Sequence, residues 1–145
     1  METTVSLVQM LDARERRVQH QQELLAQYHK PLICFTMNIC GPIKDSPLIR
    51  WGFARGRQLL RQQFLRAKLT PLYQNAVREV TGCEAFYVLD ADPLTIKKFT
   101  TDIEDATPLG RLFDMDVIRP DGRKVDREEL HLEGRRCLIC GGPAK

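Results

Sequence analysis

Long hydrophobic runs are missing from this sequence of 145 residues. A helix needs about 20 apolar residues to span a bilayer, and no segment approaches that length. The start METTVSLVQMLDARERR also lacks the basic beginning and apolar centre of a signal peptide. We therefore expect a cytoplasmic protein with no membrane partner.

Strong charge of one sign is also absent. The net charge is only +3, whereas non-specific binding of nucleic acid needs a concentrated basic surface that releases counterions. We expect no nucleic-acid partner from overall charge, and local charge must decide what the protein binds.

Histidine and cysteine are scarce, with 3 and 5 residues. An odd number of cysteines without a signal peptide favours reduced thiols over a disulfide framework. Cys137 and Cys140 form one CxxC motif, which is half of a tetrahedral zinc site, and His131 is the nearest third candidate. A thiol pair in a turn is the interpretation that this sequence favours.

What the sequence does contain is the composition of a folded protein, with 43% hydrophobic and 28% charged residues. We expect one domain over residues 1–145, beginning with a helix over about 3–29 that Thr3 or Thr4 caps. Arg14 and Gln21 interrupt the apolar line of this helix, which suggests that it lies across a surface or meets a partner. Residues 120–145 form a C-terminal segment that contains a hairpin and the CxxC motif.

An α+β core is expected over about 31–119, between these two segments. Apolar periodicity and turn residues predict strands over 31–39, 70–80, 84–90 and 111–119, and helices over 47 to about 68 and 93 to about 107. The order strand, helix, strand, strand, helix, strand is the pattern of the ferredoxin-like βαββαβ sandwich, in which the first and last strands are antiparallel neighbours.

Alternation along those two strands divides their residues between two faces. The apolar set is expected to face the helices: Ile33, Phe35, Met37, Phe113, Met115 and Val117. The polar set, expected to converge on the open face, comprises Thr36, Asn38, Asp114 and Asp116.

Asp114 and Asp116 lie one residue apart in the apolar stretch GRLFDMDV. In a strand this spacing puts both carboxylates on one face, roughly 7 Å apart, where like charges repel. Solvation, a cationic side chain or a divalent cation would offset the repulsion. The sequence leaves a solvated pair and a metal site both open.

Two basic features precede and follow the start of the second helix. The turn Gly41–Ser46 brings Lys44 and an N-capping Ser46 to a helix N-terminus, an arrangement that binds phosphate, although the turn by itself favours an ordinary cap with an exposed Lys44. Arg50, Arg57, Arg61 and Lys68 share a narrow helical arc with no acid at the right spacing. This stripe favours an acidic partner or a polyanionic ligand over a merely solvated face.

Three stretches, PLICFTMNICGPIKDS, PLGRLFDMDVIRPDGRK and RRCLIC, together resemble the citrate lyase holo-acyl-carrier-protein synthase family, also called apo-citrate lyase phosphoribosyl-dephospho-CoA transferase. The resemblance covers nearly the whole chain. Because members of that family continue beyond the CxxC motif, it implies that this chain ends short of the family's length.

The resemblance implies a nucleotidyltransferase. In such an enzyme a serine of the citrate lyase acyl carrier subunit attacks 2'-(5''-triphosphoribosyl)-3'-dephospho-CoA, which releases diphosphate and leaves the prosthetic group attached. On this reading Asp114 and Asp116 hold Mg²⁺, and Lys44 and Arg111 contact phosphate oxygens. The other implied roles are substrate binding by Thr36, Asn38, Gly41 and Ser46, and carrier binding by Arg50, Arg57, Arg61 and Lys68.

A non-catalytic ferredoxin-like module that binds nucleic acid or a regulatory ligand is the alternative. RNA-binding sheets of this topology stack bases on aromatic side chains. The predicted open face of the first strand carries Leu32, Cys34, Thr36 and Asn38, without an aromatic residue, and so favours the transferase.

Overall fold

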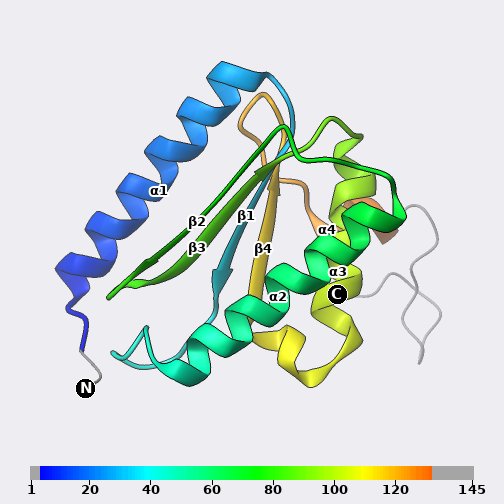
Figure 1. Ribbon diagram of the computed structural model, residues 1–145. Coiled ribbons are helices and arrows are strands. Elements are labelled where there is room, and N and C mark those ends of the chain that lie inside the picture. The colour runs from blue at the N-terminus through cyan, green and yellow to red at the C-terminus, as the bar shows by residue number, and fades with distance from the viewer. Residues whose placement is uncertain (1–3, 132–145) are drawn as a thin grey trace.

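The computed structural model describes residues 4–131 (Figure 1), which form an α+β fold around a four-stranded antiparallel sheet. The elements are α1 (Leu7–Tyr28), β1 (Leu32–Met37), α2 (Pro47–Arg66), β2 (Tyr73–Glu79), β3 (Gly82–Val88), α3 (Pro93–Ala106), the 3-10 helix η1 (Pro108–Leu112), β4 (Phe113–Ile118) and α4 (Arg127–His131). None of the helices in this part of the chain is long and apolar enough to cross a membrane.

The strands follow the order β2-β3-β1-β4 across the sheet, and every neighbouring pair is antiparallel. This confirms that the first and last strands are antiparallel neighbours. In their register Thr36 lies opposite Asp114, and Cys34 lies opposite Asp116. On its other side β1 pairs with β3, where Thr36 lies opposite Glu84.

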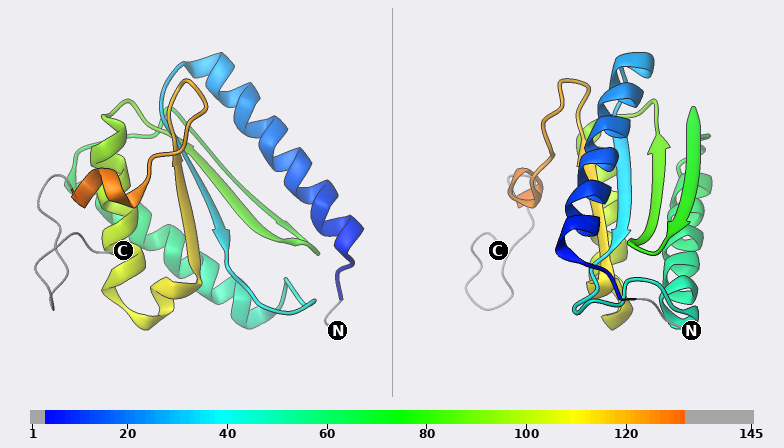
Figure 2. Two further views of the ribbon diagram at one scale, coloured as in Figure 1. Left: turned by 180° about the vertical axis from the view of Figure 1, so that it is seen from behind. Right: turned by 90° about the vertical axis from the view of Figure 1, so that its left-hand side faces the viewer.

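Helices cover both faces of the sheet. Figures 1 and 2 show α2 and α3 on one side and α1 on the other. The core under α2 and α3 contains the apolar set predicted for this face, with Met37 partly buried at its edge and the others buried: Ile33, Phe35, Phe113, Met115 and Val117. A smaller core forms where Leu24 and Leu25 of α1 pack against Leu32 and Phe86. The face expected to be open is therefore covered in part by α1.

The N-terminal helix begins later than predicted. Its cap is Ser6 and not Thr3 or Thr4, because the Ser6 hydroxyl accepts from the Gln9 N–H and the Gln9 side chain accepts from the Ser6 N–H. This reciprocal capping box satisfies two free donors at once. Just before it, the Val5 N–H donates to the Pro42 carbonyl over 2.7 Å, which fixes the start of α1 beside the loop between β1 and α2.

The cap of α2 is the predicted one, since the Ser46 hydroxyl accepts from the Ile49 N–H and Pro47 occupies the first turn. The helix lies close to β1 because Gly56 has no side chain. A Cβ there would lie 2.4 Å from the Phe35 ring. The helix ends at Arg66, earlier than predicted, and Lys68 takes a left-handed backbone conformation with φ of 57°.

The last strand is shorter than predicted. Residues 108–112 form η1 instead of extending β4, because Pro108 starts a tight turn that the Gly110 N–H closes on the Thr107 carbonyl. Arg111 therefore precedes the strand. After β4 the expected hairpin is present, with Ile118 paired to Lys124 and Gly122 at its tip. The CxxC motif at 137–140 lies outside the described residues.

Candidate functional site

A pocket of about 200 Å³ lies between α1, the end of β1, the loop before α2 and the turn between β2 and β3. It brings together four of the predicted site residues: Thr36, Asn38, Lys44 and Asp114. The other lining residues are Met10, Arg14, Arg17, Met37, Ile39, Thr81, Gly82, Cys83 and Glu84. This pocket is the candidate site because segments far apart in sequence meet there with polar and charged side chains.

A row of three polar residues crosses the sheet at the base of the pocket. Glu84 of β3, Thr36 of β1 and Asp114 of β4 lie directly opposite one another in register. Neighbouring strands are about 4.8 Å apart, so two carboxylates flank one hydroxyl on the face toward α1. The pairing of β1 with both neighbours therefore creates an acidic row that neither strand contains alone.

Cationic side chains offset the repulsion between the two aspartates in part. Lys124 Nζ lies 3.2 Å from an Asp116 carboxylate oxygen. Although Asp114 keeps contact with solvent, loss of part of its hydration raises its pKa, and the Asp116 charge raises that pKa further. Lys124 and Arg17 act in the opposite direction. An added positive charge beside Asp114 would stabilise its ionised form.

The aspartate pair fits a magnesium site that the protein completes only in part. Within residues 4–131 no group of three or more histidine, cysteine, aspartate or glutamate side chains is placed to hold a metal. Magnesium is commonly bound by one or two carboxylates together with substrate phosphates and water, and Asp114 and Asp116 match that incomplete donor set. Burial raises the pKa of the Cys34 thiol, opposite Asp116, to about 12, so this thiol is protonated in the metal-free protein.

Lys44 is held in the wall of the pocket by its own loop. Its ammonium group donates to the Ile39 carbonyl, so the chain between β1 and α2 closes on itself. An ammonium has three N–H donors, and this bond uses one of them. Asn38 is fixed by its backbone, whose N–H donates to the Leu112 carbonyl over 2.7 Å.

The remaining predicted site residues are not in the lining. Ser46 has only 9% of its surface exposed, and its hydroxyl accepts the hydrogen bond that caps α2. Gly41 is exposed and allows the loop to turn with φ of 87°, which favours glycine. Arg111 is exposed in η1, one residue from Leu112, and Asp116 lies two residues along β4 from Asp114.

Sequence reasoning missed three charged residues of the pocket. Arg14 and Arg17 come from α1, and Glu84 comes from β3. Arg14 and Gln21 interrupt the predicted apolar line of α1, but Leu7, Leu11 and Val18 of that line are exposed. The line therefore does not mark the inner side of the helix, and it gave no signal for these residues.

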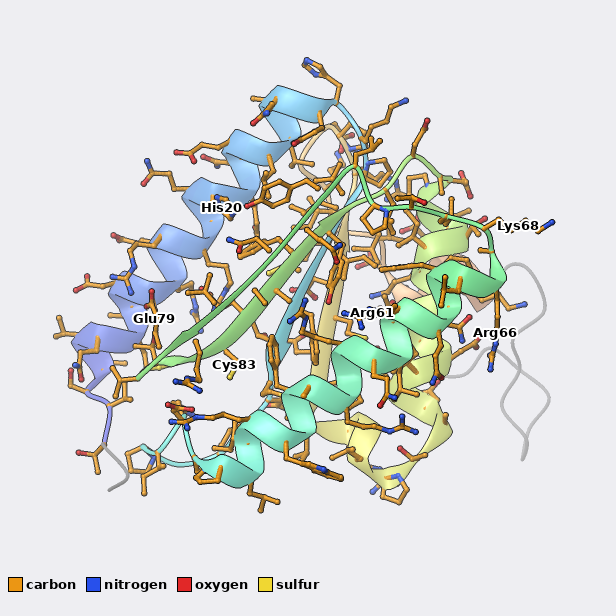
Figure 3. All side chains as sticks on the ribbon, in the orientation of Figure 1. His20, Arg61, Arg66, Lys68, Glu79 and Cys83 are labelled. Atoms are coloured by element: carbon orange, nitrogen blue, oxygen red, sulfur yellow. The ribbon has the colours of Figure 1, made fainter. Side chains whose placement is uncertain are left out.

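The basic stripe on α2 is shorter than predicted. The Arg50 guanidinium donates to both oxygens of Asp45 over 2.8 and 2.9 Å, and this hydrogen bonding lowers the pKa of Asp45. The expectation of no neutralising acid was wrong for Arg50, because Asp45 precedes the helix and folds back onto it. Lys68 lies past the end of α2 and points away from it (Figure 3).

Arg57 and Arg61 are the part of the stripe that stays together on α2. The Arg57 Nε donates to the Tyr87 hydroxyl over 3.0 Å. Both arginines line a second pocket of about 210 Å³ with Phe64, Gln74 and Tyr87. A further hollow of about 360 Å³ between α2 and α3 contains none of the predicted site residues.

Comparison with known proteins shows the family of the chain. Residues 5–145 match a family described as apo-citrate lyase phosphoribosyl-dephospho-CoA transferase. The chain is 36% identical over 136 residues to the protein of that name from Citrobacter koseri, which covers 94% of this chain and 74% of that protein. The corresponding protein of Escherichia coli O157:H7 is 35% identical over the same shares.

A longer relative matches as well. The protein CitXG of Haemophilus influenzae is 36% identical over 146 aligned residues, which cover 97% of this chain and 30% of that protein. The chain therefore spans about a third of this relative and about three quarters of the other two.

Proposed function

The chain belongs to the apo-citrate lyase phosphoribosyl-dephospho-CoA transferase family, and we propose that it transfers the prosthetic group of citrate lyase. The proposed donor is 2'-(5''-triphosphoribosyl)-3'-dephospho-CoA. The proposed acceptor is a serine of the apo-citrate lyase acyl carrier subunit, and diphosphate is the leaving group. Membership of the family makes the chain a transferase.

The observation that carries the proposal is the composition of the pocket between α1 and the end of β1. It combines cations from two segments, Lys44 and the arginines of α1, with the Asp114 carboxylate and the neutral Thr36 and Asn38. Phosphoryl transfer depends on positioning and on neutralising the charge of the phosphates more than on a covalent protein nucleophile. The pocket offers groups for positioning and for charge neutralisation. It offers no thiolate nucleophile from Cys34, because burial raises the pKa of that thiol.

The positions of the residues support individual roles in the proposed reaction. Lys44 has N–H donors left for a phosphate oxygen after its bond to Ile39, while Thr36 and Asn38 hold polar groups of the donor. Ser46 and Gly41 act by shaping the loop, since the Ser46 hydroxyl caps α2 and Gly41 allows the turn before it. Arg111 of η1 does not line the pocket, and in this proposal it would add positive charge for the phosphates.

Asp114 and Asp116 would hold Mg²⁺ in this proposal. The bound cation would neutralise the phosphates and stabilise the leaving diphosphate. The residues support this role by their chemistry, since they present two carboxylates on one strand face and Asp114 has a raised pKa.

The proposal extends to the fold and to the docking of the acceptor. The element order and the strand order β2-β3-β1-β4 support a ferredoxin-like sandwich with α1, the hairpin and α4 added. Arg57 and Arg61 support a carrier-binding surface on α2, because acyl carrier proteins are typically acidic.

The test is to incubate the protein with the apo carrier subunit, the triphosphoribosyl donor and Mg²⁺, and to weigh the carrier by mass spectrometry. We expect the carrier to gain the mass of phosphoribosyl-dephospho-CoA and diphosphate to be released in equal amount. A carrier mass that stays unchanged, or a gain that occurs without the protein, would refute the proposal.

A further inference from the structure

α1 contributes two arginines to the candidate pocket, and one of them is held by a carboxylate of the sheet. Arg17 Nη1 lies 2.8 Å from Glu84 Oε2, and the two side chains are only 22% and 20% exposed. Arg14 lies one helical turn earlier and lines the same pocket. The helix that covers the sheet therefore supplies a cationic wall.

A second pair on the same helix shows which feature is particular to the pocket. Arg16 and Glu79 also join α1 to the sheet, but their atoms are 3.2 Å apart and their side chains are 59% and 45% exposed. Glu79 lies at the edge near α1 in Figure 3. Neither residue lines the pocket. Only the Arg17 pair is half-buried against it.

The geometry leaves Arg17 able to bind a second anion. A guanidinium has five N–H donors in a planar fork, and the bond to Glu84 uses one of them. Arg17 also lowers the pKa of Asp114 and of Cys34, so its charge acts across the floor of the pocket. An arginine in this position suits a phosphate, which it can bind through two parallel hydrogen bonds.

We propose that Arg14 and Arg17 of α1 bind the polyphosphate chain of the donor, and that Arg17 exchanges Glu84 for a phosphate oxygen when the donor binds. The identity of the donor rests on the proposed function, but the ligand class, a polyphosphate, rests on the pocket. Glu84 is then the counter-ion of Arg17 in the free protein, and it competes with the ligand.

Calorimetric titration with inorganic tripolyphosphate, in buffer containing EDTA, tests the protein's cations alone. We expect Arg17→Ala to weaken binding by about tenfold or more, since one charged hydrogen-bond donor is lost. Arg14→Ala is expected to weaken it less, because Arg14 is exposed. The matched control Arg16→Ala should stay within about twofold of wild type, as expected for an exposed pair outside the pocket.

Glu84→Gln separates ligand binding from a merely structural ion pair. It breaks the same pair as Arg17→Ala but removes a negative charge, so binding should be as tight as wild type or tighter. If Arg17→Ala unfolds the protein, Arg17→Lys takes its place in the test. Because it keeps the charge but loses the planar fork, its affinity should lie below that of wild type and remain measurable. Equal losses in Arg17→Ala and Glu84→Gln, an equal loss in Arg16→Ala, or no binding by wild type would overturn the inference.

The two proposals fail in different ways. If tripolyphosphate binding follows the expected pattern but the carrier gains no mass, the arginines bind polyphosphate and the proposed transferase reaction is wrong. If the carrier gains mass while Arg17→Ala binds tripolyphosphate as wild type does, the reaction stands and the role of α1 is wrong.

Discussion

Two groups of charged residues in this protein are built in opposite ways. In the C-terminal cluster, formed by Glu104, Arg119, Arg127 and Glu129, every charge has a partner. Arg127 lies 2.7 Å from Glu104 and 3.1 Å from Asp105, Arg119 pairs with Glu129, and Glu104 also accepts the Met115 N–H. In the pocket, Arg14 and Lys44 have no carboxylate partner within residues 4–131.

The difference separates structural charge from charge that is available to a ligand. The C-terminal cluster joins α3, β4 and α4, because Glu104 accepts hydrogen bonds from both the Met115 N–H and Arg127. In the pocket, cations and carboxylates lie close together, but not every cation is paired with a carboxylate. A polyanion that enters the pocket would find Arg14 and Lys44 without a carboxylate partner. It would compete with Glu84 only for Arg17.

The largest effect is expected in the pocket. Asp114→Asn should lower the rate of transfer by at least about a hundredfold, because a metal ligand would be lost. Asp116→Asn should act in the same direction. Mass spectrometry of the carrier over time measures the rate, and thermal melting checks that both variants stay folded. Near wild-type transfer in both, or wild-type transfer unaffected by EDTA, would contradict the metal site.

The next effect falls on stability, in the C-terminal cluster. Glu104→Ala should lower the free energy of unfolding by about 1–3 kcal/mol, because the Met115 N–H and Arg127 lose a partly buried partner. Urea unfolding measures it, and the exposed neighbour Glu128→Ala serves as the control. The affinity for tripolyphosphate should not change. If Glu104→Ala lowered the affinity for tripolyphosphate and left the free energy of unfolding unchanged, the C-terminal cluster would serve ligand binding and not stability.

Lys44→Ala removes a cation of the pocket that has no carboxylate partner within residues 4–131. We expect the donor to bind about tenfold more weakly, since a charged hydrogen-bond donor is removed, while the carrier binds as before. Calorimetric titration with each ligand separately measures both affinities. Equal losses for donor and carrier would mean that Lys44 only holds its loop through Ile39.

Arg57 and Arg61 lie outside both clusters and test the docking surface. Reversing both charges to glutamate should slow association with the carrier several-fold, while transfer at saturating carrier stays nearly unchanged. The wild-type association rate should fall with salt, because screening limits such charges to roughly 8–10 Å. Arg16→Glu with Arg66→Glu has the same net charge and is the control. Collapse of transfer at saturating carrier would instead place these arginines on the donor.

The smallest effect is a pH-dependent difference in stability. Because the pKa of Asp114 is raised in the folded protein, its ionisation disfavours folding, and this cost appears as pH rises through the raised pKa. Asp114→Asn should therefore be more stable than wild type at pH 7, by less than about 1 kcal/mol for so exposed a group. The difference should vanish as pH falls toward about 4, the usual pKa. A difference that grows with acidity would refute this sign.

Features that depend on residues close together in the chain could be predicted from the sequence. Alternation along two strands placed Thr36 and Asp114 on one face and their apolar neighbours on the other, and their register confirms it. Ser46 was recognisable as a cap because capping depends on residues three positions apart. These features depend on neighbours in the chain, so the printed order of residues is enough to find them.

The packing of distant elements sets which charges share the pocket and which are paired elsewhere. Arg17 and Glu84 are 67 positions apart, and they meet because α1 crosses the face of the sheet that Thr36 occupies. Conversely, two residues of the predicted α2 stripe are not available on the helix. Arg50 is paired with Asp45, and Lys68 lies in a left-handed conformation past the end of the helix. A helical arc fixes the direction of a side chain from its own axis, whereas its partner depends on how distant elements pack.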